Sequence, residues 1–245
     1  MTQEPLATLH DARPERVMVI VAHPDDADFG PAGTVARWVR AGSVAHLVCC
    51  TRGDAGADEA RTDPLALART REAEQRAAAR HVGYAEVTFL HCPTVRSPTT
   101  LRRASSWCGS SAASDPTRSW RRTPTVQCAR GGHVQHTDHR AAAGRPALDA
   151  VYPAARNALA FPHLVIHEGL EPHAVRWMYL FWTERPDVWV DVTATLDTRL
   201  AALHEHASQI RDAEGFDDRI RAWAAEDAGP FGVDAVDAFR LLDLA

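Results

Sequence analysis

A short apolar run that stops abruptly at a histidine constrains the fold more than any other feature of this sequence. Residues 16–22 read RVMVIVA and are followed directly by His23 and Pro24. A β-branched run of this length, bounded by a proline, predicts a strand that is buried on both faces of a sheet. We therefore expect a core strand that gives way to a polar loop.

Strands and helices alternate after this first strand. A helical pattern from Thr34 ends at Gly42, and the apolar residues 44–50 predict a second strand. Residues 64–82 are rich in good helix formers and end at Gly83, before a third expected strand at 86–90. This alternation predicts an α/β fold with a parallel sheet.

The second half of the chain resumes the pattern. We expect a helix over 138–150, strands at 177–182 and 188–192, and a helix over 196–210. The last 30 or so residues suggest an amphipathic helix that packs against the edge of the sheet or against a partner subunit in a homo-oligomer. The 245 residues suffice for a single domain over 1–245 that needs no disulfides.

Residues 94–133 differ in composition from the rest of the chain. They hold seven arginines, seven serines and six threonines, but Asp115 is their only acidic residue. Three explanations stay open: a disordered insertion, a basic binding arm, or out-of-frame translation of a GC-rich gene. We expect this anomalous, irregular segment to loop out or to be disordered, because arginines in a core position carry a large desolvation cost.

Charge, hydropathy and cysteine content narrow the class of protein. All 27 basic residues are arginine and the formal net charge is −5, which argues against a nucleic-acid partner. No apolar run approaches the roughly 18–20 residues of a membrane span, and the first 14 residues lack a secretory signal pattern. The five cysteines form no CxxC pair, which suits a reducing compartment. We therefore expect a cytoplasmic protein without a membrane partner.

The residues that follow the first strand, His23-Pro24-Asp25-Asp26, form the strongest chemical motif of the chain. Open α/β sheets bind ligands at the carboxyl ends of their strands, so the position of the motif suits its chemistry. His23 and Asp26, three residues apart on a tight turn, are suited to bind one cation. Asp25 between them is then free to act as a base on a cation-bound water.

A second cluster, His136-Thr137-Asp138-His139, offers the third ligand that a zinc site requires. If His139 completes a His/Asp/His set, the fourth position stays open to water, as in catalytic zinc sites. His136 would be a proton donor or oxyanion partner, and Asp138 would hold an imidazole in one tautomer. For this cluster alone, a solvated helix start near Asp138 is the plainer alternative.

Together these motifs resemble the LmbE-like or PIG-L-type family of zinc-dependent deacetylases. The resemblance covers most of the chain outside 94–133. It is carried by VMVIVAHPDDADFGPAGTVARW (17–38), CTRGDAG (50–56), TREAEQRAAARHVG (70–83), HTDHR (136–140), LDAVYPAARN (148–157), EGLEPHAVRWMYLF (168–181), PDVWVDVT (186–193) and LHEHASQ (203–209). Family members usually have HPDH in place of HTDH, and a helix and an apolar strand in place of the anomalous segment.

The resemblance implies a Rossmann-like fold and the hydrolysis of an N-acyl bond, typically N-acetyl, on an amino-sugar or mycothiol-like thiol-conjugate substrate. It implies one zinc ion per chain, held by His23, Asp26 and His139, although iron(II) also suits such ligands. Asp25 would be the general base, and His136 would stabilise the oxyanion and protonate the leaving amine.

Two further residues have alternative interpretations. Arg71 lies where the family places a substrate-binding arginine, but an arginine in such a helix is more often solvated. His206 faces the site or, more simply, lies on the surface of an amphipathic helix.

Two other functions stay open. A chain whose anomalous segment keeps His136 and His139 from the metal would be a catalytically impaired relative, retained as a binding or vestigial protein. Nucleotide binding is disfavoured, because the first loop has only Gly30 and Gly33 rather than a GxGxxG motif. Coordination of the metal by His139 distinguishes an active deacetylase from an impaired relative.

Overall fold

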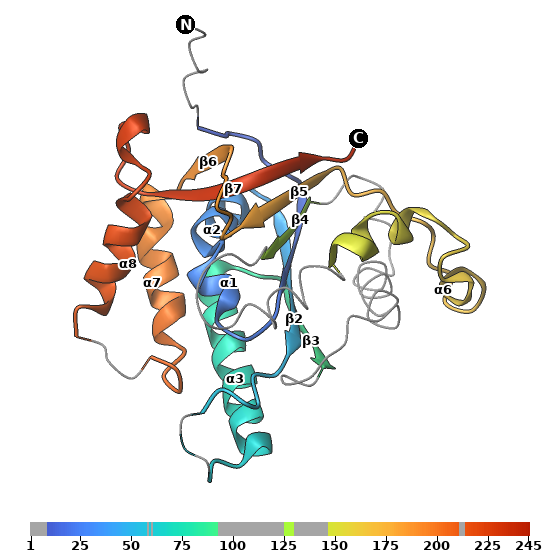
Figure 1. The fold of residues 1–245 in the computed structure, drawn as a ribbon, viewed down its shortest axis with the longest axis horizontal. Coiled ribbons are helices and arrows are strands. Elements are labelled where there is room, and N and C mark those ends of the chain that lie inside the picture. Colours follow the sequence, from blue (N-terminus) through green and yellow to red (C-terminus); the bar gives the residue numbers. More distant parts are fainter. Residues whose placement is uncertain (1–8, 58, 60, 93–124, 130–146, 211–213) are drawn as a thin grey trace, which may run out of the picture.

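The computed structural model of the chain is built on one seven-stranded sheet (Figure 1). It describes residues 9–57, 59, 61–92, 125–129, 147–210 and 214–245. The strands are β1 (Arg16–Val21), β2 (Val44–Thr51), β3 (Glu86–Cys92), β4 (Thr125–Ala129), β5 (Trp177–Phe181), β6 (Val188–Asp191) and β7 (Val236–Asp243). Across the sheet they follow the order β3-β2-β1-β4-β5-β7-β6.

The first five strands of this order pair in parallel, whereas β7 is antiparallel to both β5 and β6. The predicted α/β fold with a mostly parallel sheet is therefore confirmed. The strand order reverses at β1, because β2 and β3 extend the sheet on one side and β4 and β5 on the other. Such a switch point opens a crevice at the carboxyl ends of the two central strands, here β1 and β4.

Helices cover both faces of the sheet (Figure 1). One face carries α1 (Asp26–Phe29), α2 (Ala32–Arg40), α3 (Pro64–Val82), α7 (Leu196–His204) and α8 (Phe216–Ala225). The other carries the helical residues 147–151, η1 (Ala154–Arg156) and α6 (Pro162–Ile166). The short turns η2 (Thr193–Thr195) and η3 (Gly229–Phe231) precede α7 and β7.

The alternation of side chains along the strands divides the core into two clusters. Val17, Val19 and Val21 of β1 pack under the helices of the first face, whereas Met18 and Ile20 belong to the cluster on the second face. All five side chains are buried. As predicted, β1 is therefore covered on both faces.

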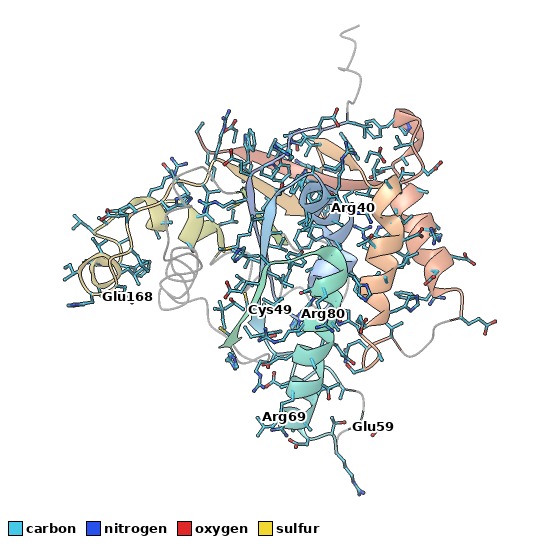
Figure 2. The ribbon with its side chains drawn as sticks, turned by 180° about the vertical axis from the view of Figure 1, so that it is seen from behind. Arg40, Cys49, Glu59, Arg69, Arg80 and Glu168 are labelled. Atoms are coloured by element: carbon cyan, nitrogen blue, oxygen red, sulfur yellow. The ribbon has the colours of Figure 1, made fainter. Side chains whose placement is uncertain are left out.

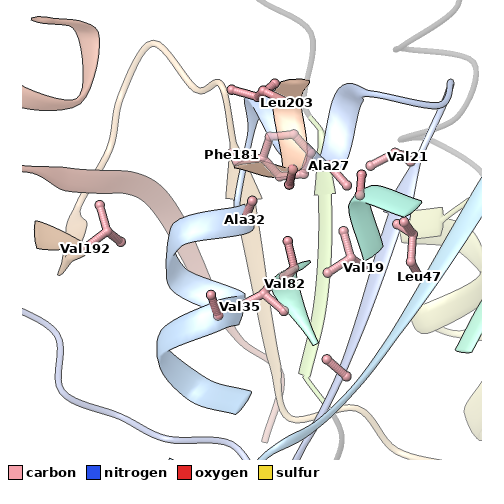
Figure 3. Close-up of a cluster of buried hydrophobic side chains, with 14 of the residues drawn as sticks. Val19, Val21, Ala27, Ala32, Val35, Leu47, Val82, Phe181, Val192 and Leu203 are labelled. Carbon is pink, nitrogen blue, oxygen red and sulfur yellow. The ribbon is translucent and has the colours of Figure 1, made fainter. Parts of the chain in front are cut away.

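The helix α1 packs tightly on the end of β5. Ala27 of α1 and Leu203 of α7 lie beside Phe181 in the first cluster (Figure 3). A Cβ atom at Gly30 would lie 2.6 Å from the Phe181 ring, so a glycine is required for this close approach. This packing fixes the short helix that follows the candidate metal-binding loop.

The predicted elements agree well with the observed ones where local signals are strong. The helix α3 has the predicted bounds, because the Asp63 side chain accepts a hydrogen bond from the Leu65 N–H at one end and Gly83 adopts φ +93° at the other. The strands predicted at 177–182 and 188–192 are β5 and β6. Most of the helix predicted over 138–150 lies outside the described residues.

One prediction about the anomalous segment is wrong. Its residues 125–129, which were expected to loop out, form β4 and pair in parallel with both β1 and β5. Backbone hydrogen bonds to the strands on both sides hold β4 in place. A segment of five residues can form these bonds without a clear apolar periodicity, so its sequence gives little sign of a strand. The other residues of 94–133 lie outside the described part of the chain.

The expected C-terminal amphipathic helix is confirmed only for α8. Residues 236–243 form β7, which lies between β5 and β6. The sequence VDAFRLLD suits either a helix or a half-buried strand, and pairing on both edges determines the outcome. Among the described residues, no helix is both long and apolar enough to cross a membrane.

His173 lies close to η1, in a position that makes stability depend on pH. Burial lowers its pKa from 6.5 to about 4, with further contributions from the positive charges of Arg16 and Arg156. The imidazole is therefore neutral in the folded protein at pH 5, whereas in the unfolded chain it binds a proton below about pH 6.5. The stability that depends on neutral His173 is lost as the pH falls from about 6.5 towards 4.

We expect His173→Gln to reduce this pH dependence. Between pH 7 and pH 5 the free energy of unfolding should fall by about 1–2 kcal/mol more in the wild type than in the variant, because glutamine does not titrate. Urea unfolding of both proteins at the two pH values measures the difference. Equal losses in the two proteins would contradict the prediction.

Candidate functional site

The loop that follows β1 lies at the switch point of the sheet. β1 pairs with β4 as far as Ile20 and Cys128, so the chain leaves the two strands at neighbouring points on the same edge. The loop after β1 carries His23, Asp25 and Asp26. Residues 130–146, which follow β4, are the part of the chain in which the second predicted cluster lies.

The structure brings together one half of the predicted site. His23, Asp25, Asp26 and Arg71 are described, whereas His136, Asp138 and His139 lie outside the described residues. The roles assigned to the latter three stay predictions. Within the described part of the chain, no group of three metal-ligating side chains occurs.

His23 and Asp26 approach each other across a tight turn. The backbone N–H of His23 donates to Asp26 Oδ2 at 2.9 Å, and the same oxygen lies 3.4 Å from His23 Nδ1. Two ligand atoms at about 2.0–2.1 Å from a tetrahedral zinc ion are about 3.3 Å apart. Both side chains are largely buried, at 13% and 1% exposed. Their spacing and burial suit two ligands of one cation.

Asp25 has an unusual backbone conformation. Its φ of +89° with ψ of −31° lies outside the regions that residues with a side chain normally adopt. Such a conformation costs about 1–3 kcal/mol and persists only where neighbours hold it. Here the Asp25 N–H donates to Gln75 Oε1 at 2.8 Å, and its carbonyl oxygen accepts from the N–H groups of Asp28 and Phe29 at 2.9 and 3.0 Å.

Arg71 binds this loop through its guanidinium group. The group donates to Asp25 Oδ2 at 3.1 Å, to the Pro24 carbonyl at 2.7 Å and to the Gly53 carbonyl at 3.1 Å. A Cβ atom at Gly53, which has φ +68°, would overlap the guanidinium, so the CTRGDAG motif supplies a glycine here. The interpretation of Arg71 as a solvated residue is wrong, and its contact with substrate stays a prediction.

The electrostatic surroundings of Asp25 favour proton transfer near neutral pH. Burial and the adjacent charge of Asp26 raise the pKa of Asp25 to about 6, although the charges of Arg71, His206 and His23 act in the opposite direction. A carboxylate with a raised pKa is a stronger base than an exposed one. The role of Asp25 as the general base stays a prediction.

A buried polar cluster adjoins Asp25. Asp28, Gln75 and His206 are each 0% exposed. Gln75 Nε2 donates to Asp28 Oδ2 at 2.7 Å, and His206 Nε2 lies 2.8 Å from the same oxygen. Burial alone lowers the pKa of His206, but the hydrogen bond and charge of Asp28, with other nearby carboxylates, raise it overall. The interpretation of His206 as a surface histidine is wrong.

The residues after α7 form hydrogen bonds with α3 and with the loop after β2. Ser208 donates to the Glu74 carboxylate from its backbone N–H at 2.8 Å and from its hydroxyl at 2.7 Å, and Gln209 Nε2 donates to the Gly56 carbonyl at 3.2 Å. The helix predicted over 196–210 ends at His204, and the polar residues that follow it bond to other segments. The LHEHASQ motif thus links α7 to α3 and to the loop after β2.

Sequence analysis did not identify Asp28 and Gln75. A signal existed for Gln75, because the buried positions of α3 recur at helical spacing and include two polar residues. These positions are Ala68, Arg71, Gln75, Ala78, Ala79 and Val82. In contrast, Arg69 and Arg80 of the same helix are exposed (Figure 2). For Asp28 we find no comparable local signal.

Comparisons with known proteins place these motifs in a family. The sequence profile described as PIG-L, GlcNAc-PI de-N-acetylase, matches residues 18–150, more than half of the chain. The chain is 36% identical over 85 residues to the 1D-myo-inositol 2-acetamido-2-deoxy-alpha-D-glucopyranoside deacetylase of Kineococcus radiotolerans. That alignment covers 33% of this chain and 24% of the relative, so the chain matches about a quarter of that protein's length.

Two further comparisons extend over most of the chain. The diacetylchitobiose deacetylase of Thermococcus kodakarensis is 24% identical over 195 residues, which are 80% of this chain and 70% of that protein. The solved structure of the N,N'-diacetylchitobiose deacetylase from Pyrococcus horikoshii is similar with a TM-score of 0.81 at 24% identity. It covers 94% of this chain and 84% of the other, and at this identity the likeness shows the fold.

A buried and an exposed arginine of α3 provide a matched test of the buried contacts. Arg71→Met should lower the free energy of unfolding by about 2–4 kcal/mol, because it removes three hydrogen bonds and leaves buried acceptors without a donor. Arg69→Met, at an exposed position, should change it by less than about 0.5 kcal/mol. Urea unfolding measures both, and similar values for the two variants would contradict the assigned role of Arg71.

Proposed function

Since the chain belongs to the PIG-L family of GlcNAc-PI de-N-acetylases, we propose that it removes the N-acetyl group from an N-acetylated amino sugar. The observation that carries the proposal is the placement of His23, Asp25 and Asp26 together at the switch point of the sheet, where open α/β sheets bind ligands. The relatives from Kineococcus and Thermococcus, both named as deacetylases of N-acetylated sugars, support this substrate class. A thiol conjugate of the mycothiol type is the second substrate class.

We propose that His23, Asp26 and His139 hold one zinc ion. The 3.4 Å spacing and the burial of the first two ligands support this set, and iron(II) is the alternative metal. When bound, the metal polarises the acyl carbonyl and makes water nucleophilic at neutral pH. Six residues lie between Ala129, at the end of β4, and His136, so the seven Cα–Cα steps can span up to about 23–25 Å. His136 and His139 are thus within reach of the loop.

The residues of the chain divide the proton transfers between them. Asp25, oriented by Arg71, would accept a proton from the water while the water oxygen bonds to the carbonyl carbon. His136 would stabilise the resulting oxyanion and protonate the leaving nitrogen, while Asp138 holds an imidazole in one tautomer. The C–N bond then breaks, and acetate and the free amino sugar leave.

β4 also bears on the alternative of a catalytically impaired relative. That alternative rested on the apparent lack of a strand that delivers His136 and His139 to the sheet edge. Because β4 lies directly beside β1, the topology supports an assembled site. The cytoplasmic location and the homo-oligomer stay predictions.

The metal site is tested by the zinc content of ligand variants. The purified chain should bind about one zinc ion. His139→Ala and Asp26→Ala should each weaken zinc binding at least about 10-fold, because losing a metal ligand costs more affinity than losing a residue that only hydrogen-bonds to a ligand. Competition with a chelating dye measures the affinity. His204→Ala, which removes an exposed histidine paired with Asp217, is the control. Unchanged affinity in His139→Ala would exclude this ligand set.

The reaction is tested with the zinc-loaded protein. It should release a primary amine from N-acetylglucosaminyl inositol or from N,N'-diacetylchitobiose, and Asp25→Asn should lower kcat by about 10²–10⁴-fold, because an amide cannot accept the proton. Amine release is followed with fluorescamine, and Asp197→Asn at an exposed position is the control. A wild type that stays inactive with zinc and with iron(II) would exclude the proposed reaction, and an Asp25→Asn variant with unchanged kcat would exclude Asp25 as the base.

A further inference from the structure

Three buried residues connect α1, α3 and the segment after α7 to the backbone of Asp25. Gln75 accepts from the Asp25 N–H at 2.8 Å and donates to Asp28 at 2.7 Å, and His206 lies 2.8 Å from the same Asp28 oxygen. All three side chains are 0% exposed. None of the three has a part in the proposed proton transfers, so their burial beside the base needs another explanation.

The amide of Gln75 satisfies its two neighbours in one orientation only. Its oxygen faces the Asp25 N–H, and its NH₂ group faces the Asp28 carboxylate. In the reversed orientation two donors would face each other at Asp25, and two acceptors would face each other at Asp28. The Asp28 carboxylate therefore decides which atom of Gln75 meets the Asp25 backbone.

His206 fixes the carboxylate in turn. Asp28 belongs to a short helix of four residues. His206 belongs to a segment that is held at two further points: Ser208 donates to Glu74 of α3, and Gln209 donates to the Gly56 carbonyl. An imidazole nitrogen that faces a carboxylate carries its hydrogen there and donates. Asp28 Oδ2 thus receives two N–H donors from outside its own helix.

We propose that Gln75, Asp28 and His206 are positioning residues that hold the Asp25 backbone in the conformation that aims its carboxylate at the reacting water. The inference rests on the proposed role of Asp25 as the base. Its physical reason is the φ of +89°, which Asp25 keeps while its N–H has an acceptor. Relaxation to an ordinary conformation would rotate the side chain away, and small displacements of a catalytic group have large effects on rate.

The first test separates positioning from a purely structural role. Gln75→Met has a side chain of similar length without the amide, and it should lower kcat about 10–100-fold at nearly unchanged KM and zinc content. Leu164→Ala removes a buried side chain of α6, on the opposite face of the sheet, and is the control. It should lower the thermal unfolding temperature but leave the kcat of the folded protein within about twofold of wild type.

The second test uses two replacements of His206. A glutamine nitrogen can take the place of imidazole Nε2 and donate to Asp28, whereas leucine cannot donate. His206→Gln should therefore keep kcat within about threefold of wild type. His206→Leu should lower kcat as much as Gln75→Met does. An equal loss of kcat in both variants would overturn the link through Asp28.

The third test needs neither metal nor substrate. Hydrogen exchange of the Asp25 amide, measured by NMR relative to the Val19 amide of β1, should be slow in wild type, in His206→Gln and in Leu164→Ala. It should be at least about 10-fold faster in Gln75→Met and His206→Leu. An unchanged exchange rate in Gln75→Met, or an unchanged kcat in that folded, zinc-loaded variant, would overturn the inference. An inactive wild type with this exchange pattern would instead refute only the proposed function.

Discussion

The pairing of β1 with parallel strands on both sides, under a helical layer on each face, determines where the polar groups of the site lie. A strand that is covered on both faces has no place for His23 or Asp26 along its length, because buried polar groups without partners are costly. The end of the strand is the first point at which these side chains can be accommodated. Since the strand order reverses at β1, this end of the strand lies at a switch point, where open α/β sheets bind ligands.

The same constraint explains why the site rests on a buried polar cluster. Arg71 and Gln75 lie on the apolar face of α3, and the cost of their burial is offset by hydrogen bonds to the loop and to Asp28. Each of these bonds satisfies a group that would otherwise be left buried and unpaired. The groups are therefore mutually dependent, and their contributions to stability and to the geometry of Asp25 are not additive.

Much of the fold and half of the candidate site could be predicted because the signals are local. Asp63 and Gly83 set the ends of α3, and the run before His23 identifies β1. In contrast, β4 and β7 form through backbone pairing with strands that are distant in the sequence. Such pairing gives little recognisable pattern within the five residues of β4 or the eight of β7. The contact between Asp28 and His206 joins residues 178 positions apart, and no periodicity within either segment indicates it.

The proposed cation would offset negative charge in the described part of the site. Asp25, Asp26 and Asp28 lie close together, and the guanidinium of Arg71 is already engaged by Asp25 and by two carbonyl oxygens. Asp28 is paired with His206, and repulsion by the adjacent charge of Asp26 adds to burial in raising the pKa of Asp25. A divalent cation held by His23 and Asp26 would offset this repulsion. It would leave Asp25, whose carboxylate contacts Arg71 rather than His23, as the carboxylate that accepts a proton.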